Sequence, residues 1–277
     1  MIKIVADIGV NHNGNMDNAL LLMHHAKEAG VDAVKFQKRL PALSIPKCMW
    51  DEKRMTPWGE RKYIEYKEDI EFNDYKPIDK QSKWLDILWF ASAWDEPSVR
   101  YLESFDVPYH KVASACLTND DLIIAMCKTG KTVILSTGMS TESEIRHAVN
   151  LLERYSNGYI ICHCNSSYPC PVGDINLSRI LTLKNMFPGV PVGYSGHEVG
   201  LATTIAAVAL GVQYIERHIT LDRAMWGTDQ AASIEPQGFR RLVKDIRNVE
   251  KAMGNGMFAM TDLEKAKRLQ LKGVYGQ

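Results

Sequence analysis

The sequence has no excess of charge of either sign, and this absence excludes two classes of partner. Its 277 residues contain 33 lysines and arginines against 33 aspartates and glutamates. A basic face is the usual electrostatic footprint of a protein that binds nucleic acid or lies on a membrane surface. We therefore expect neither nucleic acid nor a membrane as a partner.

Long apolar runs and a secretory leader are also missing. No run approaches the roughly 18–20 apolar residues that a membrane span needs, and residues 1–6 enter a strand-like pattern without the charged and apolar regions of a signal peptide. The six cysteines are scattered through a chain that is 45% hydrophobic, which is ample for a core. We therefore expect reduced thiols in a cytoplasmic protein.

Short apolar runs alternate with amphipathic helical stretches along most of the chain. Three of these stretches end in a glycine that fits a left-handed helix cap, Gly30, Gly130 and Gly211. Residues 140–144 look like a capped helix start with acids in the first turn. The runs expected to form strands are 2–9, 33–37, 88–92, 110–114, 133–136, 159–163, 190–194 and 213–216.

Eight such strand–helix units without a hairpin signature predict an α/β fold, a single-domain (β/α)8 TIM barrel over residues 1–277. An open nucleotide-binding sheet is disfavoured because the first loop, residues 9–15, lacks the G-x-G-x-x-G spacing. Residues 39–75 form an insertion after the second strand, long enough to be functional or to contain short helices of its own. Residues 253–277 form a tail with a basic helix over 263–271.

Polar side chains end every predicted strand, at the face where barrels of this kind carry their active sites. A lone lysine at a strand end is usually solvated, but Lys35 stands in a buried pattern and would need a compensating anion. Serines could cap helices, although Ser114, Ser136 and Ser195 precede small residues and suit an oxyanion. The strand-end residues are Asp7, Asn11, His12, Lys35, Gln37, Ser92, Lys111, Ser114, Ser136, Thr137, His163, Asn165, Ser166, Tyr168, Ser195, His197, Glu216 and His218.

Two histidines, His197 and His218, follow successive predicted strands and would point into one mouth. Neutral imidazole is a common metal ligand near physiological pH. Together with two lysines at the same face, they indicate a metal-assisted reaction on an anionic substrate. Cys162 and Cys164 flank His163 but would face the other way in a strand, so we expect core residues there and no zinc site.

At this point the motifs resemble those of the N-acetylneuraminate (sialic acid) synthase family and its relatives that make legionaminic and pseudaminic acids. The resemblance covers essentially the whole chain. The matching segments are Asn11-His12-Asn13-Gly14, Val34-Lys35-Phe36-Gln37, Tyr109-His110-Lys111-Val112-Ala113-Ser114, Ile134-Leu135-Ser136-Thr137-Gly138-Met139, His163-Cys164-Asn165-Ser166-Ser167-Tyr168-Pro169, Gly193-Tyr194-Ser195-Gly196-His197 and Glu216-Arg217-His218-Ile219-Thr220.

The resemblance implies a condensation of phosphoenolpyruvate with the open-chain aldehyde of an N-acylated hexosamine such as N-acetylmannosamine. The expected products are a nonulosonic (sialic-type) acid and phosphate, and the expected assembly is a homodimer. It implies a divalent metal on His197 and His218, usually manganese, with magnesium and cobalt as alternatives. It places phosphoenolpyruvate at Lys35, Ser92, Lys111, Ser114, Ser136, Ser166 and Ser195, the sugar at Asp7, Gln37, Tyr168 and Asp229, and catalysis at Asp7, Lys35, Lys111, His197 and His218.

Three departures from the family pattern concern the sugar more than the reaction. Asp7 stands where members commonly carry glutamate, and Cys116 replaces a glutamate seen in some members. Sialic acid synthases also carry a small C-terminal antifreeze-like domain whose arginine reaches the partner's sugar site, and no such domain follows here. We therefore expect the barrel to close its own sugar site, with the insertion over 39–75 as a lid. Its tryptophans, Trp50 and Trp58, would stack on the sugar or pack on the rim.

Two other functions stay open from the residues alone. A metal-dependent sugar isomerase or epimerase would use more carboxylate ligands and would not need two lysines facing a phosphate. A non-catalytic barrel that binds a sugar or a phosphate and regulates a partner would lack some of the metal or lysine positions, and all are present.

Overall fold

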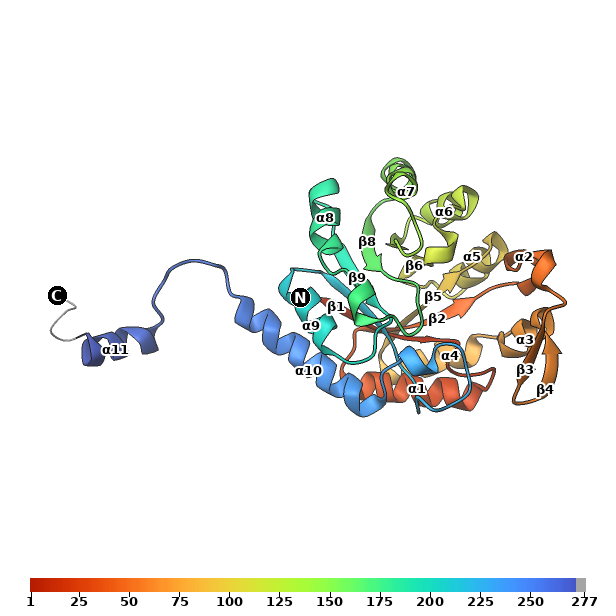
Figure 1. Ribbon diagram of the computed structural model, residues 1–277, viewed down its shortest axis with the longest axis horizontal. Helices are drawn as coiled ribbons and strands as arrows, with labels where there is room; N and C mark the ends of the chain where they lie inside the picture. The colour runs from red at the N-terminus through yellow and green to blue at the C-terminus, as the bar shows by residue number, and fades with distance from the viewer. Residues whose placement is uncertain (273–277) are drawn as a thin grey trace.

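The computed structural model of the protein describes residues 1–272 and consists of a barrel with two appendages. Eight parallel strands close in the order β1-β10-β9-β8-β7-β6-β5-β2. The helices surround this barrel, while the insertion after β2 and the C-terminal helix lie at opposite ends of the molecule (Figure 1). The (β/α)8 barrel predicted from the sequence is confirmed.

The barrel strands coincide with the predicted apolar runs to within a few residues. The largest shifts are at β9 and β10, which begin and end later than predicted, and at β6, which ends before Ser114. The strands are β1 (Lys3–Gly9), β2 (Ala33–Lys38), β5 (Leu88–Ala93), β6 (Tyr109–Val112), β7 (Thr132–Ser136), β8 (Tyr159–Cys164), β9 (Val192–Gly196) and β10 (Tyr214–His218).

The helix ends follow the predicted caps. Gly30, Gly130 and Gly211 have φ of 82°, 78° and 78°, the left-handed region that costs glycine least. Thr141 and Glu144 form a capping box at the start of α7. The outer helices are α1 (Met16–Ala29), α4 (Lys76–Leu85), α5 (Glu96–Glu103), α6 (Asp120–Cys127), α7 (Glu142–Tyr155), α8 (Arg179–Met186), α9 (Ala202–Ala209) and α10 (Pro236–Met253).

The insertion is a small subdomain at the barrel edge (Figure 1). It contains α2 (Pro41–Ser44), the 3-10 turn η1 (Lys47–Met49), an antiparallel hairpin of β3 (Lys53–Thr56) and β4 (Gly59–Lys62), and α3 (Tyr63–Ile70). The expectation of a chain without hairpins was wrong here. The turn runs through Pro57 and Trp58 to Gly59, whose φ of 100° favours glycine, so a turn signal was present between two strongly charged strands.

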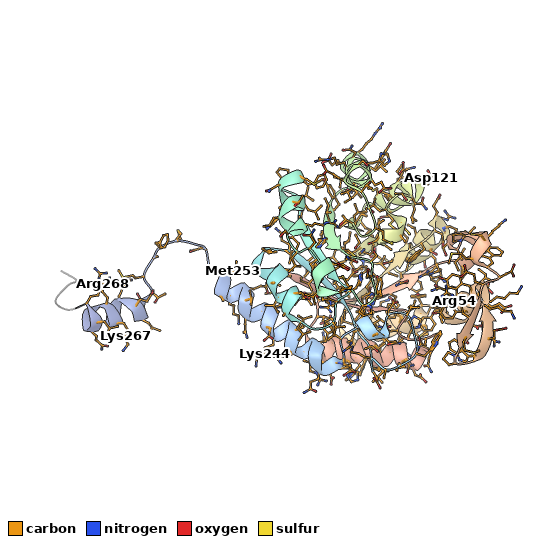
Figure 2. All side chains as sticks on the ribbon, viewed as in Figure 1. Arg54, Asp121, Lys244, Met253, Lys267 and Arg268 are labelled. Carbon is orange, nitrogen blue, oxygen red and sulfur yellow. The ribbon has the colours of Figure 1, made fainter. Side chains whose placement is uncertain are left out.

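The C-terminal tail leaves the barrel after Met253 as an extended segment and ends in α11 (Asp262–Leu271). Lys267 and Arg268 on α11 are labelled in Figure 2, far from the barrel wall. The predicted basic helix is therefore present, and the end of the predicted tail, residues 273–277, lies outside the described residues. Within residues 1–272, none of the helices has the combination of length and apolar character that a membrane crossing requires.

A fully buried ion pair joins β10 to the loop after β9. Arg217 Nη1 lies 2.8 Å from Glu198 Oε1, and neither side chain is exposed. The carboxylate also accepts from the hydroxyls of Tyr194, Thr203 and Thr204. Burial, the largest single influence, would raise the pKa of Glu198, but the charge of Arg217 and the hydrogen bonds to the carboxylate together outweigh burial and hold this pKa below the usual range. Burial lowers the pKa of Arg217 as well, although a guanidinium stays charged at physiological pH.

We predict that Arg217→Met lowers the free energy of unfolding by about 3–5 kcal/mol, because it leaves the Glu198 carboxylate buried without its cation. Urea denaturation followed by circular dichroism measures the loss. The matched control is Arg146→Met, which removes an exposed pair with Glu142 and should cost only about 0–1 kcal/mol. Equal losses in the two variants would contradict the prediction.

The same pair predicts a pH dependence. Since the pKa of Glu198 in the folded state is lower than its ordinary 4.5, its contribution is complete above pH 4.5 and is lost as the pH falls through the folded value. The stability gap between wild type and Arg217→Met should therefore narrow on acidification below pH 4.5.

Candidate functional site

The carboxyl ends of the barrel strands enclose a cavity of about 170 Å³. Most of the residues that line it are polar, as the strand-end pattern predicts. Of the predicted site residues, all but Ser136 and Asp229 line it. The lining consists of Asp7, Lys35, Gln37, Ser92, Trp94, Lys111, Ala113, Ser114, Ala115, Met139, Ser166, Tyr168, Ser195, His197, Glu216 and His218. We call this space the inner cavity.

The strand register explains why these side chains meet. Asp7 pairs with Lys35 of β2 on one side and with His218 of β10 on the other. Ser195 of β9 pairs with Glu216 of β10. Because paired residues of neighbouring strands point to the same face, each set projects into the barrel together.

Lys35 is held by two buried carboxylates. Its Nζ lies 2.8 Å from Asp7 Oδ2 and 3.5 Å from Glu216 Oε1, and it donates to Ser92 Oγ at 3.1 Å. Burial alone would lower the pKa of Lys35, but Asp7 and Glu216 outweigh burial and raise it. Burial would likewise raise the pKa of Glu216, but the charge of Lys35, followed by that of Lys111, lowers it to about 2. The cation and Glu216 are therefore both ionised at neutral pH.

Lys111 differs from Lys35 because it forms no ion pair with any described carboxylate. Its ammonium donates to Ser136 Oγ at 2.6 Å and to the Val112 carbonyl at 2.8 Å. The side chain is only 2% exposed. Ser136 does not line the inner cavity and lies directly beside this ammonium. A buried ammonium whose direct partners are all neutral is costly, so Lys111 is available to an anion in the cavity.

Two serine hydroxyls approach each other over Gly138. A Cβ built on Gly138 would lie 2.3 Å from Ser166 Oγ and 2.7 Å from Ser114 Oγ, so only glycine leaves room for both. The Gly138 amide donates to Ser114 Oγ at 3.1 Å. Ser166 Oγ is buried and has no partner in the described part of the chain. Ser114 Oγ donates to Cys164 Sγ at 3.5 Å, so the Ser166 hydroxyl is the one of these two that is available to an anionic oxygen.

The histidine pair fits a divalent metal. The two ring centroids are 5.5 Å apart. His197 Nδ1 lies 2.6 Å from the Asn165 carbonyl, so it carries the ring proton and leaves the lone pair on Nε2, beside Tyr168 OH at 2.9 Å. His218 Nε2 lies 3.3 Å from Asp7 Oδ2, while His218 Nδ1 and Asp7 Oδ1 are buried without described partners. Two imidazoles beside a carboxylate form a donor set that first-row divalent metals accept.

Gly9 lets the His218 ring occupy this position. Its φ is 53°, and a Cβ there would lie 3.0 Å from His218 Cε1. The strand pairing between β1 and β2 shifts by one residue between Asp7 and Gly9. The irregular end of β1 therefore brings the backbone close to the imidazole without a side chain between them.

A second, larger cavity of about 520 Å³ adjoins the inner one. Gln37, Trp94, Ala115 and Tyr168 line both spaces. We call it the outer cavity. Asp229, predicted to contact sugar, lies here and not in the inner cavity. The remaining walls are Val10, Arg39, Leu43, Ser44, Ile45, Pro46, Met49, Tyr63, Lys67, Cys116, Asn119 and Thr228, many of them from the insertion.

Several residues singled out in the sequence lie elsewhere. His163 faces the outer helices and lies 2.7 Å from the Ile175 carbonyl, and His12 stacks on Phe72 with ring centroids 4.2 Å apart. Cys164, expected in the core, is buried but lies 3.8 Å from His197 Nδ1, directly behind the site. Neither insertion tryptophan lines the inner or the outer cavity: Trp50 donates to the Ile45 carbonyl, and Trp58 packs on Trp226.

Sequence reasoning missed three residues of the outer cavity. Trp94 stands two positions after Ser92, and Arg39 two positions after Gln37, so the two-residue period of a strand would have placed both at the mouth. Lys67 of α3 comes from the insertion, and no local pattern marks it.

One surface cluster has the composition of a metal site but lies outside both cavities. His24, His25 and Glu28 of α1 have donor atoms within 4.8 Å of one another. They lie on the outer helical layer, where Glu28 pairs with Arg240 of α10. The carboxylate is therefore already paired with a cation.

Comparisons with known proteins identify the family of this chain. The model of the NeuB family matches residues 22–258. The human N-acetylneuraminate-9-phosphate synthase is 35% identical over 91% of this chain and 71% of its own length. The N,N'-diacetyllegionaminic acid synthase of Campylobacter jejuni is 33% identical over 98% of this chain and 81% of its own.

A solved structure agrees as well. The N-acetylneuraminic acid (sialic acid) synthetase of Leptospira borgpetersenii serovar Hardjo-bovis, in complex with citrate, superimposes with a TM-score of 0.87 at 31% identity. The match covers 99% of this chain and 92% of that one. The chain therefore belongs to the NeuB family, the synthases that condense phosphoenolpyruvate with an amino sugar.

Proposed function

We propose that the barrel condenses phosphoenolpyruvate with the open-chain aldehyde of an N-acylated hexosamine, giving a nonulosonic acid and phosphate. The observation that carries this proposal is the inner cavity, in which two buried lysines and two histidines face one space. The NeuB membership supports the same reaction. An isomerase or epimerase is disfavoured because it has no use for these lysines, and a non-catalytic barrel is disfavoured because the whole donor set is present.

In this proposal the inner cavity holds phosphoenolpyruvate. Lys111, whose direct partners are neutral, binds the phosphate or the carboxylate, and Lys35 contributes a second cation, held in position by Asp7 and Glu216. The serines that surround the anionic oxygens are Ser92, Ser114, Ser166 and Ser195, with Ser136 positioning Lys111. Charged hydrogen bonds of this kind are stronger than neutral ones.

His197 and His218 would hold the divalent ion, with the Asp7 carboxylate alongside. A bound divalent ion supplies Lewis-acid polarisation of the aldehyde oxygen. In this proposal the aldehyde lies between the histidines and the phosphoenolpyruvate. The contact of Tyr168 with His197 at the opening to the outer cavity supports that position. Holding both reactants in one space makes the bond-forming step effectively unimolecular.

The proposed bond changes balance with one water. C3 of phosphoenolpyruvate attacks the aldehyde carbon, whose oxygen takes up a proton, and positive charge develops at C2. Water adds at C2 and loses one proton, which balances the proton taken up by the aldehyde oxygen. Phosphate then leaves by cleavage of the C2–O bond and takes up the proton of the new C2 hydroxyl, which yields the 2-keto acid. Asp7 is the acid residue with an unpaired oxygen in the cavity, so we assign it the proton transfers.

The hexosamine extends from the histidines through the shared walls into the outer cavity. Gln37 and Tyr168 line both spaces, and Asp229 lines the outer one. We assign these three residues to the sugar. The insertion over residues 39–75 forms one wall of the sugar space and needs no tryptophan for stacking.

Manganese as the ion and a homodimer as the assembly remain predictions of the family resemblance. Metal analysis and sedimentation of the purified protein test them directly.

We predict that Lys111→Met lowers activity alone, whereas Lys35→Met lowers both activity and stability. Lys111 has no acidic partner, so Lys111→Met should keep wild-type stability and lower kcat/KM for phosphoenolpyruvate by about 10- to 100-fold. Lys35→Met should lose activity. It should also lower the free energy of unfolding by about 3–5 kcal/mol, because it leaves the carboxylates of Asp7 and Glu216 buried without their cation. The control is the exposed Lys128→Met. Wild-type kinetics in Lys111→Met would refute the role.

We predict that His197→Ala and His218→Ala lose bound metal and activity together while their far-ultraviolet circular dichroism stays unchanged. The double variant His24→Ala/His25→Ala removes the surface cluster and should keep both. Metal content after dialysis and turnover with added manganese are the measurements. The assignment fails if the surface double variant loses activity. It also fails if His197→Ala stays active after a chelator has removed the divalent ions.

We predict that purified protein consumes phosphoenolpyruvate only when an N-acylated hexosamine and a divalent ion are both present. A panel of such sugars, with mass spectrometry of the product, tests this and identifies the acceptor. Phosphoenolpyruvate consumption that is independent of every sugar would contradict a condensation.

A further inference from the structure

A third cavity lies outside the barrel, and the proposed mechanism does not use it. It has a volume of about 210 Å³ and lies between α7 and α8, which stand on either side of β8 (Figure 1). It shares no lining residue with the inner or the outer cavity. Side chains normally fill the space between a sheet and its helices at close-packed density. We call this open space the helix cavity.

His163 of β8 is a buried polar side chain in the wall of the helix cavity. It is 1% exposed, and its Nε2 lies 2.7 Å from the Ile175 carbonyl, so Nε2 carries the ring proton. Burial first, and then the charge of Arg179, lowers the pKa of His163 in spite of that hydrogen bond. The ring is therefore neutral at physiological pH. Its Nδ1 keeps a lone pair that has no partner in the described part of the chain, and it can accept from a ligand.

Arg179 of α8 adds a cation to the same walls. Its guanidinium forms no ion pair and no hydrogen bond with a described side chain or carbonyl, and it lies close enough to His163 to affect the pKa of that ring. The acid in the walls is Glu142, which already pairs with Arg146 at 2.8 Å. A guanidinium binds a carboxylate through two parallel N–H bonds. Arg179 is therefore placed to bind one.

The remaining walls are hydroxyl-bearing and apolar. Thr137, Ser140 and Thr182 each donate to a backbone carbonyl, at 3.0, 3.1 and 3.4 Å. Their oxygens therefore remain as acceptors, and a ligand should bring O–H or N–H groups to them. The apolar side chains of the walls can cover a short hydrocarbon part of the ligand, and they are Ile145, Leu183 and Met186.

The helix cavity lies directly behind a turn that serves the inner cavity. Ser136 accepts from Lys111 at 2.6 Å, Thr137 lines the helix cavity, and Met139 lines the inner cavity. The two sides of one short segment thus belong to two different sites. A ligand that contacts Thr137 acts on the backbone that positions Ser136 and, through its hydroxyl, Lys111.

We propose that the helix cavity binds a small carboxylic acid with an O–H or N–H donor and a short apolar part, and that this ligand changes the affinity for phosphoenolpyruvate. The carboxylate pairs with Arg179, the donor faces His163 Nδ1, and the apolar part packs on Leu183. The binding itself is independent of the proposed function, whereas the effect on phosphoenolpyruvate rests on it. Amino acids and hydroxy acids both have this chemistry.

The test uses leucine and leucic acid, two acids of the same shape that carry an ammonium and a hydroxyl as donor. Calorimetry measures binding, and the methyl NMR signal of Met186, assigned with Met186→Leu, locates it. At least one acid should bind wild type and shift that signal, which also identifies the donor, and leucinamide, which lacks the carboxylate, should not. Arg179→Met should weaken binding by about 10- to 100-fold, the range of a hydrogen bond to a charged group. The control Arg154→Met, which removes an exposed arginine of α7 outside the cavity, should match wild type.

Titration with phosphoenolpyruvate separates the helix cavity from the inner cavity. Coupling between two sites is reciprocal and saturates, so phosphoenolpyruvate should change the affinity for the acid up to a limit. An acid bound in the inner cavity would instead be displaced without limit, and this result would overturn the proposal. The proposal also falls if neither acid binds more tightly than about 10 mM, if leucinamide binds as tightly as leucine, or if Arg179→Met leaves binding unchanged.

Binding and kinetics together distinguish failure of this inference from failure of the proposed function. If an acid binds through Arg179 but the KM for phosphoenolpyruvate stays unchanged in an active enzyme, the link to the inner cavity is overturned. If the acid binds through Arg179 and no phosphoenolpyruvate is consumed with any sugar, the ligand site stands and the condensation falls.

Discussion

The ion pair between Arg217 and Glu198 fixes the geometry on which the mouth depends. Both side chains point outward, toward α9, and successive residues of a strand point to opposite faces. His218 follows Arg217 within β10, and His197 is the chain neighbour of Glu198 just beyond β9. The buried pair outside the barrel therefore anchors the backbone segments that carry both imidazoles. Gly196 lies under the pair, because a Cβ there would be 2.5 Å from Glu198 Oε2. The ion pair between Arg217 and Glu198 outside the barrel thus helps to fix the positions of His197 and His218 inside it.

Much of this arrangement could be predicted from the sequence, because it depends on local periodicity. Lys35 and Gln37 share a face through the two-residue strand period, and the closure of a parallel barrel brings the strand ends together at one rim. The glycine caps were predictable for a similar reason, since the left-handed conformation at Gly30 is a property of one residue. Motif resemblance then assigned chemical roles that periodicity alone left open.

The rest depends on packing between segments far apart in the sequence. No local signal states that Lys67 of the insertion faces the same space as Asp229, which follows the last barrel strand. The hairpin of β3 and β4 was missed because its strands are mostly charged and exposed, and so lack an apolar alternation. His163 is a further example. It was predicted correctly to lie in a strand, but its side chain faces the outer helices and not the mouth, and this depends on how β8 packs.

The division of the site into two adjoining cavities has an evolutionary consequence. The inner walls come from the ends of barrel strands, whose register and buried charges tolerate little change, whereas much of the outer wall comes from one surface insertion. Insertions at a barrel rim can vary in sequence without disturbing the strands beneath them. Under the proposed function, in which the outer cavity holds the sugar, changes in residues 39–75 would alter which sugar is accepted without changing the residues of the inner cavity.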